Sequence, residues 1–265
     1  MRMMPFFLGP LVLVLAWAAD TGPTAVVSAA NPGVGVAPDS LATVYGDHLA
    51  SQTALAVALP WPVSLGDIPG VSITDSASKS QVASLVYVSP SQMNLWIPPG
   101  TAAGPATLSF PATELPPGAG TAALRTVPVI IQKVAPGLFS VDAQGTAAAT
   151  AIRIVIPTGI QSPVPVFTCG ASGNCTTVPI DVGTDAPVYL SLYGTGIRGA
   201  GSLSNVSVTI GNTSIQPLYV GPQPQFPGLD QVNVPLVLSL RGSGLVNVTV
   251  TANGVSSNAV RINIR

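Results

Sequence analysis

The stretch Val260–Arg265, VRINIR, alternates strictly between apolar and polar residues. The same alternation occurs in Val246–Thr251, VNVTVT, and in Val206–Ile210, VSVTI, which runs into the turn residues Gly211-Asn212. Successive side chains of a β-strand point to opposite faces, so a period of two indicates strands with one buried face. Turn residues recur about every 8 to 12 residues, which is typical of sandwiches rather than βαβ units. The sequence therefore predicts an all-β fold.

Composition excludes several other classes of protein. Of the 265 residues, only 7% are charged, 47% are hydrophobic, and Gly and Pro contribute 27 each. Coiled coils and helix bundles need far more Glu, Lys and Arg and fewer helix breakers. A net charge of −1 with ordinary apolar content argues against a disordered chain. Nine Lys and Arg against ten Asp and Glu leave no basic surface for a nucleic acid.

Four short blocks occur twice in the same order. Each copy ends in a Gly followed by an alternating strand, Gly104 to Phe110 and Gly244 to Thr251. The period is too long for a solenoid and fits two tandem immunoglobulin-like β-sandwich units of roughly 100 residues each. The paired blocks are LATVYG (41–46) with YLSLYG (189–194), VSIT (71–74) with VSVT (206–209), LVYVSP (85–90) with PLYVGP (217–222), and QMNL (92–95) with QVNV (231–234).

The repeat sets the expected domain boundaries. Residues 134–185 contain strand-like pieces of their own, and we assign them to the second unit. The Pro-rich stretch Pro111 to Gly120 is expected to be a loop tip of the first unit. The expected segments are a signal peptide at 1–18, a short loose tail at 19–30, a first sandwich at 31–133, and a second sandwich at 134–265 with a cysteine hairpin insertion.

The first 18 residues have the features of a secretory signal peptide. Arg2 precedes an apolar stretch that ends in Ala16-Trp17-Ala18, so cleavage is expected after Ala18. The apolar core of about 14 residues is shorter than the roughly 20 of a membrane span, although an uncleaved anchor is the alternative. Loss of Arg2 leaves 8 Lys and Arg against 10 Asp and Glu, a net charge of −2. We expect a mature chain without a transmembrane helix that is secreted, displayed at the cell surface or periplasmic.

The two cysteines are consistent with export. Cys169 and Cys175 flank the short flexible stretch GASGN, so their sulfur atoms can meet across a hairpin. An oxidising compartment favours a disulfide between them. Free thiols and a metal site are the alternatives, but a metal site lacks nearby His partners. A loop this small predicts only modest stabilisation.

Several of these blocks resemble a known family in order and spacing, over about residues 30 to 265. The family is the Solibacter-type uncharacterised C-terminal domain family of acidobacteria, and the Tyr-Gly-x-x-Leu style also resembles the IPT/TIG immunoglobulin-like module. The resemblance implies an exported β-sandwich protein. The family has no established activity, so no functional residue can be transferred from it. The matching blocks are Ala37–Ala50, Tyr87–Asn94, Val134–Phe139, Tyr193–Gly199 and Gly228–Pro235, and the cysteine segment through Asp181 is similar to a subset of the family.

Candidate catalytic residues are few. A Ser-His-Asp triad would have to use His48, which is the only histidine, with Asp47 or Asp39 as its carboxylate. No Gly-x-Ser-x-Gly motif occurs. Glu114 is the only glutamate, whereas a glycosidase needs two carboxylates across a cleft. We therefore expect His48 to be a turn residue and the protein not to be an enzyme.

Two candidate ligand sites remain. Asp181 and Asp185 are close enough in sequence to join backbone carbonyls around a calcium ion, although no D-x-D-x-D-G loop is present and no cofactor is expected otherwise. Trp61 and Trp96 are the candidates for stacking on a sugar ring, and packing in the core or a loop is the alternative.

Amide and tyrosine residues also recur in both units. Gln92-x-Asn94 and Gln231-x-Asn233 are expected to satisfy backbone groups at a fixed corner of each sandwich. Two tyrosines at equivalent positions are expected to lie at a corner or in the core with the phenol bonded to the backbone, namely Tyr45 and Tyr193.

These observations favour a secreted or cell-surface, non-enzymatic protein used for adhesion, scaffolding or protein contact. Its expected partner is a protein or polysaccharide at the cell surface, not a nucleic acid. A polysaccharide-binding module is the first alternative function, and an extracellular hydrolase is the second. Polar strand positions such as Ser207, Thr209 and Asn247 carry hydroxyl and amide groups rather than charges, which leaves few ionisable groups for catalysis.

Overall fold

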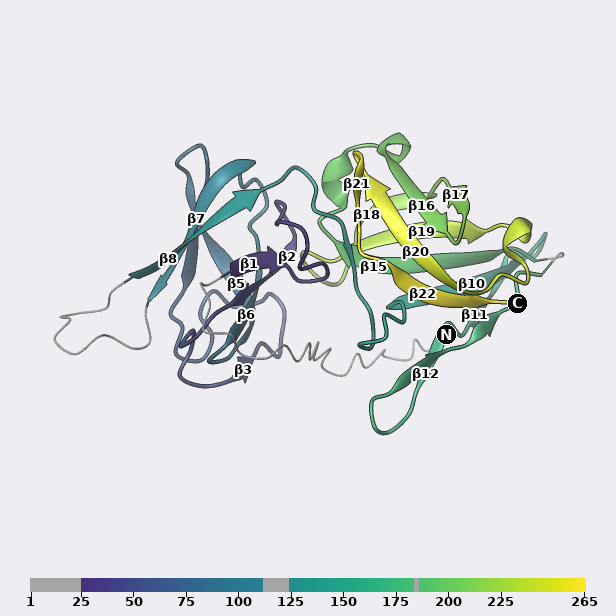
Figure 1. Ribbon diagram of the computed structural model, residues 1–265, viewed down its shortest axis with the longest axis horizontal. Coiled ribbons are helices and arrows are strands. Elements are labelled where there is room, and N and C mark those ends of the chain that lie inside the picture. The colour runs from purple at the N-terminus through teal and green to yellow at the C-terminus, as the bar shows by residue number, and fades with distance from the viewer. Residues whose placement is uncertain (1–24, 112–123, 184–185) are drawn as a thin grey trace.

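The computed structural model describes residues 25–111, 124–183 and 186–265, and these residues form strands almost throughout (Figure 1). The only helical segments within them are single 3-10 turns: η1 (Arg198–Ala200), η2 (Leu203–Asn205) and η3 (Leu238–Leu240). The predicted all-β class is confirmed. None of the helical segments described has the length and apolar character of a membrane span. The predicted signal peptide, Ala18, Glu114 and Asp185 lie outside the described residues.

Two hydrophobic cores divide the described strands into two units. The core of the first unit draws on residues from Val36 to Ile131, and the core of the second on residues from Val134 to Ile264. In each unit the alternating strands turn their apolar positions inward; Val260–Ile264, for example, is buried at every second residue. Figure 1 shows the two units side by side along the long axis of the molecule.

The first unit is one eight-stranded antiparallel sheet that folds over its own core. Strand β5 makes the fold-over, because its residues 84–88 pair with β6 and its residues 80–83 pair with β4. A bulge between Leu85 and Tyr87 marks the bend. The order is β1-β2-β6-β5-β4-β7-β8 with β3 beside β5: β1 (Ala25–Ser28), β2 (Leu41–Tyr45), β3 (Ala54–Leu55), β4 (Val71–Thr74), β5 (Ser80–Val88), β6 (Gln92–Trp96), β7 (Gly104–Pro111) and β8 (Leu124–Ile131).

The second unit is a sandwich of two six-stranded sheets with an added hairpin. One sheet has the order β11-β10-β15-β19-β18 with β9 beside β15, and the other has β14-β22-β20-β16-β17 with β21 beside β20. The strands are β9 (Gly137–Leu138), β10 (Ala149–Val155), β11 (Ile160–Val164), β12 (Phe167–Cys169), β13 (Cys175–Thr177), β14 (Pro179–Ile180), β15 (Val188–Thr195), β16 (Val206–Ile210), β17 (Thr213–Ile215), β18 (Tyr219–Pro222), β19 (Asp230–Leu236), β20 (Gly244–Ala252), β21 (Val255–Ser256) and β22 (Val260–Ile264).

The repeated blocks occupy the same register in both units. Strands β2 and β6 pair Tyr45 with Gln92, and strands β15 and β19 pair Tyr193 with Gln231. Unit one has a continuous β5 where unit two has two strands, β17 and β18. Pro217 lies between these two strands, and a proline has a fixed φ and no N–H for a ladder. The two units therefore share one arrangement of paired strands and turns, which we call the repeated frame, with local differences.

The N-terminal strand differs from the sequence expectation, whereas the disulfide agrees with it. Residues 19–30 were expected to be a loose tail, but residues 25–28 form β1 and pair with β2. The reason is tertiary: Val26 packs against the core of the first unit, and this contact orders the short stretch. The predicted disulfide between Cys169 and Cys175 is present, and it joins β12 to β13 in a hairpin that projects from the second unit (Figure 1).

Candidate functional site

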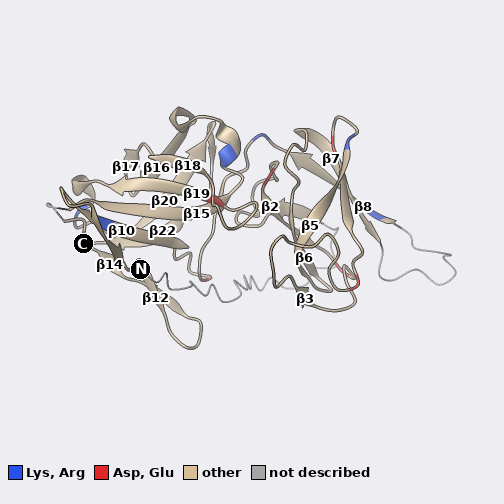
Figure 2. Ribbon diagram, turned by 180° about the vertical axis from the view of Figure 1, so that it is seen from behind, with Lys and Arg blue, Asp and Glu red and all other residues tan. Residues whose placement is uncertain are grey.

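The junction between the two units concentrates charge in a protein that has little of it (Figure 2). Arg198 of the second unit contacts two carboxylates, with 2.5 Å from Nη1 to Asp39 Oδ2 and 2.5 Å from Nε to Asp230 Oδ1. Asp39 belongs to the first unit and Asp230 to the second. One guanidinium group therefore ties the two units together. We call Asp39, Arg198 and Asp230 the junction triad.

The second unit positions its part of the triad rigidly. Asp230 begins β19 and is 0% exposed, and its Oδ2 also accepts hydrogen bonds from the backbone N–H groups of Ile197 (2.6 Å) and Arg198 (3.3 Å). Burial raises the pKa of Asp230, although Arg198 and the N–H of Ile197 act in the opposite direction. Burial alone would lower the pKa of Arg198, but the carboxylates of Asp230 and Asp39 outweigh it and raise that pKa. The guanidinium therefore stays charged.

The first unit contributes a complementary set of groups. Asp39 has a φ of 56°, and its Oδ1 accepts a 2.7 Å hydrogen bond from the indole of Trp96. The backbone N–H of Leu41 donates to Thr195 Oγ1 at 2.8 Å, so a second hydrogen bond crosses the junction. A Cβ on Gly228 would lie 2.9 Å from Trp96 Cδ1, which shows that the two units are in close contact here. This arrangement can fix one unit against the other.

The two candidate tryptophans lie in different parts of the first unit. The indole N–H of Trp96 is bonded within the junction, and the chain of the second unit packs against its ring. Trp61 lies in the segment between β3 and β4 and is partly exposed. Trp61 is therefore the better placed of the two for stacking on a sugar, and sugar binding stays a prediction.

The surroundings of Asp181 do not resemble a calcium site. Its Oδ1 accepts a 3.1 Å hydrogen bond from the N–H of Gly183, and its Oδ2 lies 3.8 Å from Nη2 of Arg265. Its backbone oxygen accepts a hydrogen bond of 2.5 Å from Arg153. Calcium prefers a shell of oxygen ligands, whereas two guanidinium groups lie here. In the described ranges no group of three or more His, Cys, Asp or Glu could hold a metal ion.

His48 lies in an exposed loop after β2 with a φ of 53°. The guanidinium of Arg125 donates to the backbone oxygens of Asp47 and His48. At the equivalent position the second unit has Gly196, with a φ of 72°. The left-handed backbone is thus a feature of the repeated frame, which supports the interpretation of His48 as a turn residue.

The recurrent amides differ from the expectation. Gln92 Nε2 donates to Asn94 Oδ1 at 2.8 Å, and Gln231 Nε2 donates to Asn233 Oδ1 at the same distance. The expectation that they bond to the backbone is wrong in this respect, because side chains two residues apart on a strand share one face and meet each other. The pairs therefore stabilise equivalent positions of the two sheets.

One of the two recurrent tyrosines also differs from the expectation. Tyr193 forms a 3.1 Å hydrogen bond to the Thr150 hydroxyl across β10 and β15, not to the backbone. The phenol that bonds to the backbone is that of Tyr219, which donates to the oxygen of Pro222 at 2.8 Å. The repeat fixes the positions of the tyrosines, whereas their partners depend on which strands are adjacent.

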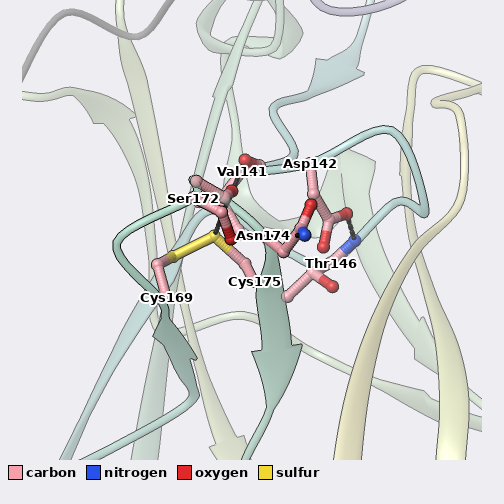
Figure 3. Close-up of a disulfide and its surroundings, with 8 residues drawn as sticks. Val141, Asp142, Thr146, Cys169, Ser172, Asn174 and Cys175 are labelled. Carbon is pink, nitrogen blue, oxygen red and sulfur yellow. Dashed lines mark hydrogen bonds between the residues drawn. A yellow bond between two sulfur atoms is a disulfide. The ribbon is translucent and has the colours of Figure 1, made fainter.

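The disulfide hairpin contacts a turn with a buried carboxylate oxygen that the sequence did not predict. Cys175 Sγ lies 3.9 Å from the backbone oxygen of Val141, and Asp142 follows it (Figure 3). Asp142 Oδ1 accepts a 2.8 Å hydrogen bond from the N–H of Thr146. Its Oδ2 is buried and has no hydrogen-bond partner among the described residues. A single aspartate in a turn gives no sequence signal for this.

A second missed feature is an exposed apolar protrusion of the first unit. Residues Val57–Trp61, which we call the apolar finger, lie between β3 and β4. Val57 is 95% exposed, and Leu59 is also exposed. From Ala54 to Val63 only the Trp61 indole carries a polar side-chain atom, and because such a run equally indicates a buried strand, the sequence does not reveal its exposure.

The comparisons with known proteins add no family. No family model matches the chain, and no curated protein matches it.

Proposed function

We propose that this chain is an exported surface protein without enzymatic activity, used for adhesion, scaffolding or protein contact. In this proposal two immunoglobulin-like units act as one extended body. The predicted signal peptide and the resemblance to an exported domain family support the location. The partner is a protein or polysaccharide of the cell surface.

The observation that carries the proposal is the junction triad. In a flexible tandem each unit can rotate independently. Here Arg198 is bonded simultaneously to one carboxylate of each unit. Removing one partner of a buried ion pair leaves an uncompensated charge, so the two units resist separation. A body held in this way keeps its loops and its hairpin at fixed spacing, which suits multipoint contact with a surface.

The outward strand faces also support contact rather than catalysis. Cross-strand neighbours such as Ser207 with Thr251 and Thr209 with Thr249 present hydroxyl groups on adjacent strands. These hydroxyl groups are uncharged, both donate and accept hydrogen bonds, and rotate to suit a partner. Such a face is suited to adaptable polar contacts.

The test is retention of the labelled chain, from Ala19 onward, on cell envelopes of the producing organism. We expect the wild type and Arg241→Ala to be retained, because Arg241 is exposed and outside the junction. Arg198→Ala is expected to be retained several-fold more weakly, since its two units lose their fixed spacing. Equal retention of Arg198→Ala, or no retention of the wild type, contradicts the proposal.

The polysaccharide alternative is tested with insoluble polymers. Retention on a purified polymer that is lost in Trp61→Ala would favour a polysaccharide-binding module. A hydrolytic activity that is lost in His48→Ala would favour the hydrolase. Envelope retention that survives both substitutions supports the contact function.

A further inference from the structure

The first unit has an insertion after β2 that the second unit lacks after β15. From the buried Leu49 to the first residue of β4, Val71, the chain of the first unit takes a long excursion, whereas the second runs from Ile197 to Val206 through two 3-10 turns. The excursion contains β3 and the apolar finger, at the side of the first unit near the label β3 in Figure 1. Loops grafted on a fixed scaffold are common places for binding.

The finger is held at its base by β5. The N–H of Ala56 donates to the oxygen of Val86 at 2.9 Å, and the N–H of Leu85 donates to the oxygen of Pro62 at 2.7 Å. Between these two anchors the residues 57–60 are all exposed, and Trp61 at the base is partly exposed. The result is a convex protrusion on a rigid strand rather than a groove.

The surroundings of the finger extend its apolar surface. Two apolar side chains that flank it in sequence, Leu55 and Val63, are about half exposed. Exposed apolar clusters of this kind mark interaction sites, whereas single exposed residues are ordinary. No charged side chain occurs from residue 49 to residue 66. The finger itself therefore offers no charged group for electrostatic attraction.

The chemistry of the finger distinguishes between a protein pocket and a lipid surface. Protein interfaces carry about one hydrogen bond per 100–200 Å², but the segment Ala54–Val63 offers only one side-chain donor, the Trp61 indole. A bilayer interface asks for the opposite: apolar groups that enter the acyl boundary and a tryptophan at headgroup level. Backbone groups that stay at headgroup depth still reach water.

We propose that the apolar finger inserts into the interfacial region of a lipid bilayer and so holds the protein against a membrane surface. Val57 and Leu59 enter the acyl boundary, and Trp61 lies at the headgroups. The proposal rests on the proposed function in placing the chain at the cell surface, and it names the surface that one side of the first unit contacts. Because the finger is uncharged, binding does not require anionic lipid.

The experiment is flotation of residues 19–265 with phosphatidylcholine vesicles and with vesicles that also contain phosphatidylglycerol. This chain contains all described strands and omits the N-terminal apolar stretch, which would itself bind lipid. We expect the wild type to float equally with both vesicles, at low salt and at about 1 M salt, where exposed charges are screened. Brominated lipids are expected to quench Trp61 fluorescence.

The matched variants are Val57→Asp/Leu59→Asp in the finger and Ile156→Asp/Ile160→Asp in the second unit, where both isoleucines are at least as exposed as Leu59. The finger variant is expected to bind vesicles about tenfold more weakly or worse, since two apolar side chains no longer enter the lipid. The control and Arg198→Ala are expected to bind like the wild type, so this outcome is independent of the envelope test. The proposal is overturned if the wild type does not float, if floating requires anionic lipid, or if the control loses as much binding as the finger variant. It is also overturned if the finger variant loses envelope retention although neither this variant nor the wild type binds vesicles.

Discussion

The loops that follow β2 and β15 are built on the same frame and do different work. Both run from a tyrosine through a residue with positive φ to a buried apolar residue, in Tyr45–Ala50 and Tyr193–Arg198. The first ends in an alanine and the second in the arginine of the junction triad. The comparison shows that the frame specifies a turn, and that the residue after the turn decides whether it contacts another unit.

The difference has a counterpart on the neighbouring strand. In the first unit the N–H of Gly46 donates to the oxygen of Ser91, and in the second Gly194 pairs with Asp230 at the corresponding position. Arginine and aspartate thus occur together where the first unit has alanine and serine. The aspartate depends on the arginine, because Asp230 without Arg198 would be a buried carboxylate that lacks its counter-charge.

The outer loops are closed by arginines of their own units. Arg125 donates to backbone oxygens of the loop after β2. Arg153 donates to the backbone oxygens of Ala186, at 3.2 Å, and Asp181, just before β15. Arg198 is the arginine among these three that pairs with carboxylates of both units.

Arg198→Ala is expected to have the largest effect on the free energy of unfolding. It leaves Asp230 buried without its guanidinium, so we expect a loss of about 3–5 kcal/mol in the free energy of unfolding. Guanidinium chloride denaturation followed by far-UV circular dichroism measures it. Arg125→Ala removes hydrogen bonds to exposed backbone and a contact over the Phe110 ring, and it is expected to cost less, about 1–2 kcal/mol.

The double variant Arg198→Ala/Asp230→Ser gives the second unit the residues of the first. It removes the buried carboxylate together with the guanidinium, so we expect it to be more stable than Arg198→Ala alone. If the double variant were less stable than the single one, the interpretation of the triad as a compensated buried pair would be wrong.

The sequence predicts the strands far better than the junction. The alternation in Val260–Ile264 specifies β22, because a period of two follows from the geometry of a single strand. The blocks around Tyr45 and Tyr193 predict equivalent positions, and the paired register agrees with them. These features are local or repeated, so one chain contains the information needed to find them.

The junction depends on contacts that no local pattern contains. Asp39 and Arg198 are 159 residues apart, and both occur in blocks that otherwise describe turns. The position of one unit against the other is set by tertiary packing at Gly228 and Trp96. Exposure of the finger could not be predicted for a related reason, since an uncharged apolar run equally indicates a buried strand.

Gly196→Ala and His48→Gly test the shared turn with opposite signs. A Cβ at Gly196 would lie 2.3 Å from the oxygen of Ala135, and the residue has a φ of 72°. Strain and overlap together are expected to cost about 2–4 kcal/mol. His48→Gly relieves a left-handed non-glycine residue and is expected to stabilise the protein by up to about 1 kcal/mol.

The control for this pair is Gly201→Ala. Gly201 also has a positive φ, of 76°, but a Cβ there meets nothing within 4 Å. We expect a cost of about 1–2 kcal/mol from backbone strain alone. Thermal and chemical denaturation of the three variants separate strain from overlap, and equal losses for Gly196→Ala and Gly201→Ala would show that the approach of Ala135 does not matter.

Removal of the disulfide tests an addition that is found in the second unit. The double variant Cys169→Ala/Cys175→Ala opens a loop with a sequence separation of 6, so we expect a loss of about 2 kcal/mol or less. Because β12 and β13 pair only with each other among the described strands, the two cores are expected to stay folded. Hydrogen exchange should show faster exchange confined to the hairpin; faster exchange in β20 or β22 would contradict this.

The smallest expected effect is a pH dependence that belongs to the first unit. The carboxylate of Asp75 closes the β4–β5 turn, and its pKa is lowered by hydrogen bonds, the largest contribution coming from the N–H of Ala102 and smaller ones from Lys79 and Ala77. The corresponding β16–β17 turn of the second unit, Gly211-Asn212, has no carboxylate. The two turns therefore respond differently to acid.

The direction of this pH dependence follows from the linkage between proton binding and folding. A carboxyl group whose pKa is lower in the folded state binds its proton more readily when unfolded, so its contribution to stability is present above its ordinary pKa, about 3.9. That contribution is lost as the pH falls through the folded value. Trp61 and Trp96 both belong to the first unit, so tryptophan fluorescence reports its unfolding. The denaturation midpoint followed by this fluorescence should fall on acidification from pH of about 5 to about 3. In Asp75→Asn the denaturation midpoint should already be lower at neutral pH, and the contribution of Asp75 to its fall on acidification should be absent. If the midpoint of Asp75→Asn falls with acid as steeply as that of the wild type, the pH dependence arises elsewhere in the protein.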